Sequence, residues 1–129
     1  MRYDEFLDRV QERAGLSSSE VARRVTEATL QTLGERIYRS ARDDVAAQLP
    51  ADLAGYLLNR VQPEVTPRHV ERFSIEEFYN RVSARTGLNY AQTVERVRAV
   101  MLTVREAISA GEWQDLEEEL PAEFDEILR

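Results

Sequence analysis

Few side chains in this sequence are suited to metal or acid–base chemistry. His69 is the single histidine, and there is no cysteine. A di-iron carboxylate site in a helical bundle needs two Glu-x-x-His motifs, whereas the residue three positions before His69 is Thr66. The lack of cysteine also excludes disulfides, thiolate metal sites and cysteine nucleophiles. We therefore predict no metal site and no cofactor, and we interpret His69 as a solvated residue in a proline-flanked loop.

Serines and paired acids offer two further routes to catalysis. Ser17, Ser18 and Ser19 stand together, but Ser17 precedes Glu20 by three positions, which is the spacing of a helix capping box. The sequence has no Gly-x-Ser-x-Gly motif and no glycine-rich phosphate loop. Paired acids need a deep cleft that raises the pKa of one carboxyl, and exposed helix faces are their usual place. The sequence identifies no catalytic residue and no small-molecule ligand, and we predict that the protein is not an enzyme.

Charge is distributed unevenly along the chain. Residues 1–72 contain 12 acids and 11 arginines, while residues 73–129 contain 12 acids and 6 arginines, within a net charge of −7. This polarity could orient two halves of the chain or dock one molecule onto another. The alternative is a set of exposed faces with scattered ion pairs, each worth little. The candidate interaction surface consists of Trp113, Arg23, Arg24, Arg39, Arg42, Glu117 and Glu118.

Two features of that surface are open to more than one interpretation. All 17 basic residues are arginine, which reflects either a high-GC genome or a need for bidentate pairing with carboxylates. Trp113 is the single tryptophan, at a position where the first half of the chain has Arg42. An aromatic residue without a counterpart is either an asymmetric core residue or an exposed contact residue.

Residues 12–24 offer a second functional hypothesis, because they resemble a helix-turn-helix. Gly15 would form the turn, and Arg23 and Arg24 lie on the capped second helix. Against DNA binding, the second helix is long and carries an apolar stripe, and residues 1–48 contain 9 acids beside 8 arginines. Binding of nucleic acid through the first half is therefore the disfavoured alternative.

The elements that would position these residues are encoded by an internal sequence repeat. Residues 4–16 return as residues 76–88, with seven identical positions at an offset of 72. After each copy, a helix cap and a long apolar stripe predict a long helix, at 18–37 in the first half. Short helices at 41–48 and 51–61 follow, and their Leu-Pro junction recurs at an offset of 71. The offset therefore changes between the cap and Leu33.

These patterns predict an all-α protein made of two tandem copies of a roughly four-helix unit. Repeats 1–61 and 73–129 are joined by a linker at 62–72, where Pro63 and Pro67 disfavour helix. Each repeat is small for an independent core, so we expect one pseudo-symmetric domain over residues 1–129. No apolar run approaches the ~18 residues that span a membrane, and the N-terminus lacks the layout of a signal peptide. We expect a cytoplasmic protein without a membrane partner.

The doubled motif also carries a family resemblance. Glu-Phe-x-x-x-Val-x-x-Arg-x-Gly-Leu, a long helix ending near Leu-x-x-Arg-Ile, and then Gln-Leu-Pro resemble the bacterial family known as domain of unknown function 2267. The residues that carry the resemblance are Glu5, Phe6, Val10, Gly15, Leu16, Leu33, Ile37, Gln48, Leu49 and Pro50, with their second-copy partners. The second copy departs from the pattern by having Glu119 where the first has Gln48.

The resemblance implies a small, helical, duplicated bacterial protein, and it implies no activity, cofactor or catalytic residue. By elimination, we expect a non-catalytic interaction or accessory module. Its partner would be another protein or a second copy of the chain.

Overall fold

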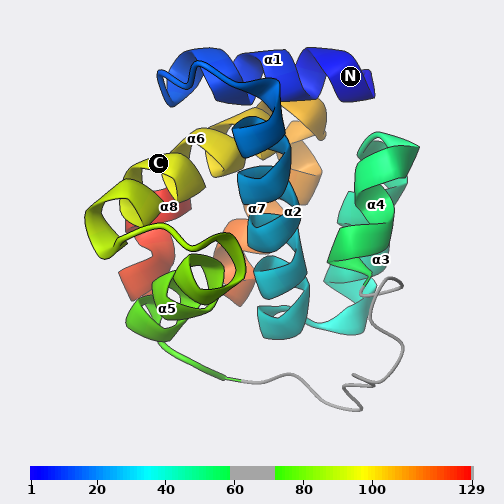
Figure 1. Cartoon of the computed structure of the whole chain (residues 1–129). Helices are drawn as coiled ribbons and strands as arrows, with labels where there is room; N and C mark the ends of the chain where they lie inside the picture. Colours follow the sequence, from blue (N-terminus) through cyan, green and yellow to red (C-terminus); the bar gives the residue numbers. More distant parts are fainter. Residues whose placement is uncertain (59–71, 129) are drawn as a thin grey trace.

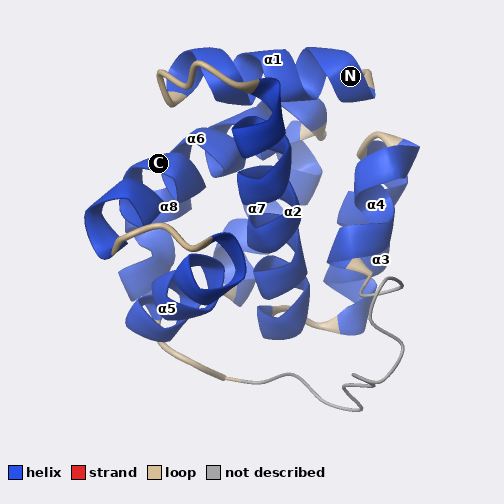
Figure 2. Ribbon diagram, viewed as in Figure 1, coloured by secondary structure: helices blue, strands red, loops and turns tan. Residues whose placement is uncertain are grey.

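The computed structural model describes residues 1–58 and 72–128, and every regular element in these ranges is helical (Figure 2). This confirms the predicted all-α class. The elements are α1 (Tyr3–Arg13), α2 (Ser19–Arg36), α3 (Arg39–Gln48), α4 (Ala51–Leu57), α5 (Ile75–Thr86), α6 (Tyr90–Ala107), α7 (Ala110–Glu119), the 3-10 turn η1 (Ala122–Phe124) and α8 (Asp125–Leu128). The predicted linker, apart from Arg72, lies outside the described residues, and so does His69.

Helix α2 runs through the middle of the molecule (Figure 1), where it packs against α1, α4, α5 and α6. Its C-terminal half is buried on every side, from Ala28 to Arg36. A helix that is buried all round belongs to the core of a bundle. The apolar stripe predicted for this helix therefore points inward, and α1 lies across one end of it.

Helix α1 ends where its glycine predicts. Gly15 has a φ of +64°, which is the left-handed conformation that glycine adopts without strain. The Leu16 N–H donates to the Gln11 carbonyl at 2.9 Å, and the Gly15 N–H donates to the Glu12 carbonyl at 3.2 Å. This is the Schellman pattern of a helix C-terminus. Gly87 also ends α5 in the left-handed conformation, with a φ of +77°, but its N–H donates to the Ser83 carbonyl at 2.8 Å and the Leu88 N–H donates to Thr86 Oγ1 at 3.4 Å.

The start of α2 differs by one residue from the predicted capping box. Ser18, not Ser17, is the N-cap, and its Oγ accepts from the Glu20 N–H at 3.2 Å. Asn89 caps α6 as predicted, in a reciprocal box with Gln92. Because Ser18 and Asn89 are 71 positions apart, the change of offset falls just before the cap rather than after it. Helix α3 begins at Arg39, two residues earlier than predicted, and α4 ends at Leu57.

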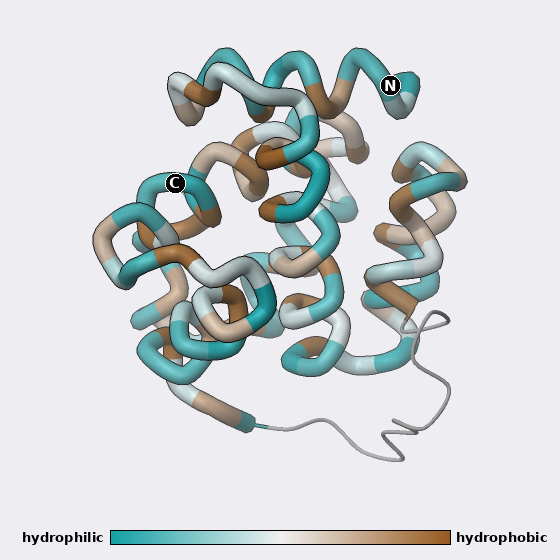
Figure 3. Tube along the Cα trace, in the orientation of Figure 1, coloured by the Kyte–Doolittle hydropathy of each residue, from teal (hydrophilic) through white to brown (hydrophobic). Residues whose placement is uncertain are grey.

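The core is continuous across both halves of the chain. Phe6, Phe78, Phe124 and Tyr79 are buried almost completely. Phe73 and Phe78 lie on either side of the Ser74 N-cap of α5 and bring their ring centroids to 6.4 Å, which is the contact of a hydrophobic staple. Hydrophilic and hydrophobic segments alternate along the helices (Figure 3), as expected for helices that bury one face. Within the described ranges, none of the helices has the length and apolarity needed to cross a lipid bilayer.

Candidate binding groove

A buried ion pair joins α5 to α2. The Arg85 guanidinium donates from Nη1 to Glu35 Oε1 and from Nη2 to Glu35 Oε2, both at 2.8 Å. Arg85 Nη1 also donates to Thr32 Oγ1 at 2.6 Å, and Arg81 Nη1 lies 3.3 Å from Glu35 Oε1. The Glu35 side chain is only 6% exposed. A bidentate, fully hydrogen-bonded geometry of this kind is what makes a buried carboxylate tolerable.

The same residue types make a second contact between α1 and α6. Arg13 Nη1 lies 2.6 Å from Glu106 Oε1 and donates to Thr103 Oγ1 at 3.0 Å. Arg9 Nη1 lies 3.5 Å from the same carboxylate. The hydrogen bond from Arg13 lowers the pKa of the Glu106 carboxyl. This pair is more open than the first, because the Glu106 side chain is 37% exposed.

We call these two contacts, Arg85–Glu35 and Arg13–Glu106, the clasp. The sequence analysis did not predict the clasp, because neither Arg13 nor Arg85 was among its candidate residues. A signal was available: Arg13 and Arg85 are 72 positions apart, and Thr32-x-x-Glu35 recurs at an offset of 71. Arg85 makes the bidentate carboxylate contact with Glu35 that arginine allows.

Helices α3 and α7 exchange a further pair of contacts. The Tyr38 N–H donates to Glu119 Oε1 at 2.5 Å, and the Ser109 N–H donates to Gln48 Oε1 at 2.6 Å. Each side chain thus caps the start of the helix in the other half. The departure from the repeat at Glu119 preserves the acceptor oxygen but adds a charge, and burial raises the pKa of this carboxyl.

A polar groove of about 420 Å³ opens beside α2, and we call it the first groove. It is lined by Glu20, Arg23, Arg24, Glu27, Ala28, Gln31, Tyr56 and Arg85. Arg23 Nη1 lies 2.9 Å from Glu27 Oε2, and Arg23 also pairs with Glu20. These hydrogen bonds raise the pKa of Arg23 further above its ordinary value. Burial, and then a hydrogen bond to Glu27, raises the pKa of Tyr56.

Gln31 differs from its neighbours in this groove because its amide is unpaired. Its side chain lies in the lining, the residue is 7% exposed, and Nε2 is buried without a hydrogen-bond partner among the residues described. Arg24 lines the groove from the same face of α2 and is exposed. Its one hydrogen bond within the described ranges runs from Nη2 to the Thr86 carbonyl at 3.3 Å.

A second groove of about 380 Å³ lies beside α6, and its lining matches the first position by position. Adding 71 to Arg24, Glu27, Ala28 and Gln31 gives Glu95, Arg98, Ala99 and Leu102, all of which line it. Adding 72 to Arg13, which also lines the second groove, gives Arg85 in the first. The equivalent of the buried Gln31 amide is Leu102, which is 38% exposed.

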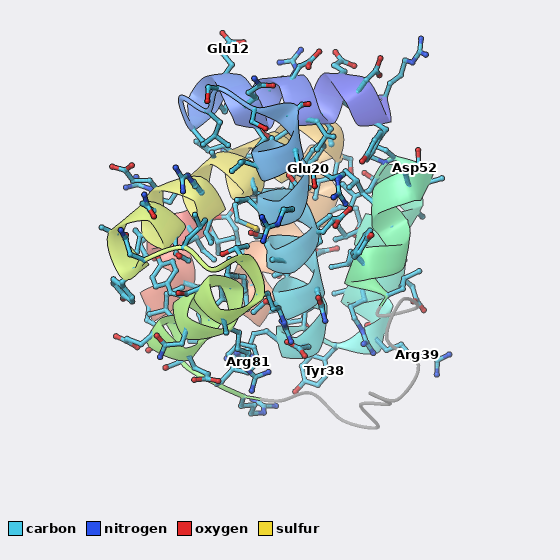
Figure 4. All side chains as sticks on the ribbon, in the orientation of Figure 1. Glu12, Glu20, Tyr38, Arg39, Asp52 and Arg81 are labelled. Carbon is cyan, nitrogen blue, oxygen red and sulfur yellow. The ribbon has the colours of Figure 1, made fainter. Side chains whose placement is uncertain are left out.

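The structure divides the predicted interaction surface. Arg23 and Arg24 line the first groove together. Arg39 is exposed at the start of α3 and points away from the bundle (Figure 4), while Arg42 is half-buried one turn later. Glu118 belongs to an acidic groove of about 390 Å³ between α3 and α7. This acidic groove is lined by Tyr38, Ser40, Ala41, Asp44, Glu112, Asp115, Glu118 and Glu119.

Two residues of the predicted surface need separate comment. Of the two interpretations of Trp113, the core residue is confirmed and the exposed contact residue is wrong, because the side chain is 3% exposed and belongs to the core. It is buried because α7 packs against α3, and the Arg105 guanidinium covers its ring with 5.6 Å from Cζ to the centroid. Glu117 lies half-buried on α7 and does not line any of the three grooves.

Metal binding finds no support in the part of the chain that the structure describes. No group of three or more His, Cys, Asp or Glu side chains is arranged there to hold an ion. His69, the residue considered for this role, lies outside those ranges.

Comparison with known proteins agrees with the resemblance in the doubled motif. Among curated proteins, none matches this chain significantly. The model of the family described as "Uncharacterized conserved protein (DUF2267)" matches residues 3–127, which is nearly the whole chain. The protein therefore belongs to the DUF2267 family.

Proposed function

We propose that this protein is a non-catalytic interaction module of the bacterial cytoplasm, built as one domain from two tandem copies of a helical unit. The clasp supports the duplicated architecture, since the first helix of each copy pairs with the long helix of the other through the same residue types. The caps that Gln48 and Glu119 exchange between α3 and α7 support it as well. In this architecture each copy depends on the other for an ion pair of the clasp and for a helix cap.

Within that frame, the first groove is the binding site. The observation that carries this proposal is the unpaired amide of Gln31, at a position where the other copy has Leu102. A buried donor without a partner costs about 1–3 kcal/mol. An apolar residue would avoid this penalty, and the second copy has one. A partner that offers a hydrogen-bond acceptor would satisfy the Gln31 amide, which no contact within the fold does.

A fragment screen by two-dimensional ¹H–¹⁵N NMR tests this proposal. The full chain is titrated with separate millimolar solutions of small acids, amines and neutral amides. We expect at least one class to shift the signals of Arg24, Ala28 and the Gln31 side chain, and to leave Ala99 and Leu102 in place. If no fragment shifts the first groove, or if both grooves respond alike, the proposal is wrong.

We do not propose binding of DNA. The helix that would read the bases is α2, which is covered by α1, α4, α5 and α6. Arg23, one of its two candidate contact residues, is held by Glu20 and Glu27. A recognition helix has to present an open face to the major groove.

A further inference from the structure

We infer that the first groove recognises a neutral ligand through a primary carboxamide group, which pairs with the side-chain amide of Gln31. This inference rests on the proposed function and names the chemistry of its ligand. Gln31 carries a donor, Nε2, beside an acceptor, Oε1, and a primary carboxamide carries the same two groups. The two amides can therefore join edge to edge through a pair of N–H···O bonds.

The charges that line the first groove beside α2 balance one another. Two carboxylates and two guanidiniums lie there, and they belong to Glu20, Glu27, Arg23 and Arg24. Arg23 donates to both carboxylates, at 3.1 Å from Nε to Glu20 and at 2.9 Å from Nη1 to Glu27. The hydrogen bond from Arg23, together with the charge of Arg24, lowers the pKa of the Glu20 carboxyl. A charged ligand would lose hydration without gaining a free counter-ion, so the groove favours a neutral ligand.

Gln31 is the polar residue of this lining whose hydrogen bonds are left open. Arg85, the remaining charged residue, donates to both carboxylate oxygens of Glu35 at 2.8 Å. Arg24 Nη2 donates to the Thr86 carbonyl at 3.3 Å. Within the described ranges, the Gln31 side chain takes part in no hydrogen bond, although the residue is only 7% exposed. A ligand that satisfies the lining therefore has to meet an amide.

The paired geometry selects a primary carboxamide over a peptide bond. In a trans peptide group the N–H and the C=O point to opposite sides, so one peptide group does not meet both atoms of the Gln31 amide. A primary carboxamide has an N–H on the same side as its oxygen. The last torsion of a glutamine side chain is soft, so the Gln31 amide can turn this edge toward a ligand in the groove.

The test is an NMR titration of the full ¹⁵N-labelled chain with probes that share one carbon skeleton. Isobutyramide is the primary carboxamide, N-methylisobutyramide the trans amide, isobutyrate the anion and isobutylamine the cation. We expect saturable shifts of the Gln31 side-chain signals with isobutyramide, at a dissociation constant on the order of 1–10 mM. The other three probes should each bind at least about tenfold more weakly, because each loses a hydrogen bond or has to be stripped of its hydration as an ion.

A fifth probe separates the two sources of a primary carboxamide. In the peptide Ac-Ala-Gln-Ala-NHMe, the glutamine side chain is the single primary carboxamide. Tighter binding of this peptide than of isobutyramide identifies a peptide ligand, and weaker binding identifies a small free amide. The groove volume of about 420 Å³ is that of a small-molecule site and also admits one side chain of a peptide.

Matched variants of the two grooves complete the test. Gln31→Leu should weaken the binding of isobutyramide about tenfold or more, whereas Leu102→Gln, at the equivalent position of α6, should bind as the wild type does. If isobutyrate or isobutylamine binds the first groove more tightly than isobutyramide, the inference is overturned while the proposed function stands. Equal binding of N-methylisobutyramide, or full binding by Gln31→Leu, also overturns it. If nothing binds the groove, the proposed function fails as well.

Discussion

Glu119 and Gln48 perform the same task with different charge. Each side-chain oxygen accepts the N–H at the start of a helix in the other half, but only Glu119 places a carboxylate in a partly buried position. Burial raises the pKa of Glu119, which means that the folded protein holds its proton more tightly than the unfolded chain does. The charged form of Glu119 therefore destabilises the folded protein slightly at neutral pH.

We predict that Glu119→Gln raises the free energy of unfolding at pH 7 by about 1 kcal/mol. The gain should shrink as the pH falls through the raised pKa of Glu119 and vanish below its ordinary value of 4.5, where the wild-type carboxyl is neutral in both states. Urea unfolding between pH 4 and pH 8 measures this. Gln48→Glu is the matched reverse change and should destabilise at pH 7. A loss of stability in Glu119→Gln at pH 7 would contradict the prediction.

At the scale of single elements, the start of α2 makes a sharp prediction. Ser18→Ala should lower the free energy of unfolding by about 1 kcal/mol, because Ser18 Oγ accepts the Glu20 and Val21 N–H groups. Ser17→Ala should change stability by less than about 0.5 kcal/mol, as surface substitutions usually do. Thermal or urea denaturation of the two variants compares them directly. If both substitutions had the same effect, or if Ser17→Ala had the larger one, Ser18 would not be the N-cap of α2.

The elements themselves were largely predictable, because their signals are local. Gly15 and Gly87 end helices through their own backbone conformation, and Asn89 caps α6 through atoms three residues away. The N-cap of α2 was predicted one residue too early, because each of the adjacent serines is able to cap a helix and the sequence does not distinguish them. Trp113 was not assignable, since its burial depends on how α7 packs against α3.

For the whole molecule, we predict that the two ion pairs of the clasp contribute unequally to the free energy of unfolding. Glu35→Gln leaves Arg85 without its buried carboxylate and should cost about 3 kcal/mol. Glu106→Gln removes a pair that is 30% and 37% exposed and should cost no more than about 1 kcal/mol. Urea unfolding of the two variants tests this difference, with m-values checked for two-state behaviour. Equal costs would show that burial does not govern the clasp.

The duplication was visible in the sequence, whereas its consequences in space were not. Identical spacing indicated that Arg13 and Arg85 do the same work, yet it could not show that each partner lies in the other half. Glu106 is 93 positions from Arg13, and Glu35 is 50 positions from Arg85. Likewise, Gln31 gave no signal as a site residue, because an isolated glutamine on a helix is ordinary until its burial is known.

We propose that Gln31 is retained for binding and not for folding. It is tested most directly by urea unfolding of Gln31→Leu, which installs the residue that the second copy has at the equivalent position. Leu102→Gln is the control, and it should be nearly neutral because Leu102 is 38% exposed. We predict that Gln31→Leu raises the free energy of unfolding by about 1 kcal/mol, because it removes a buried donor without a partner. A decrease of that size or more would show that the amide stabilises the fold, and would contradict a role for Gln31 in binding alone.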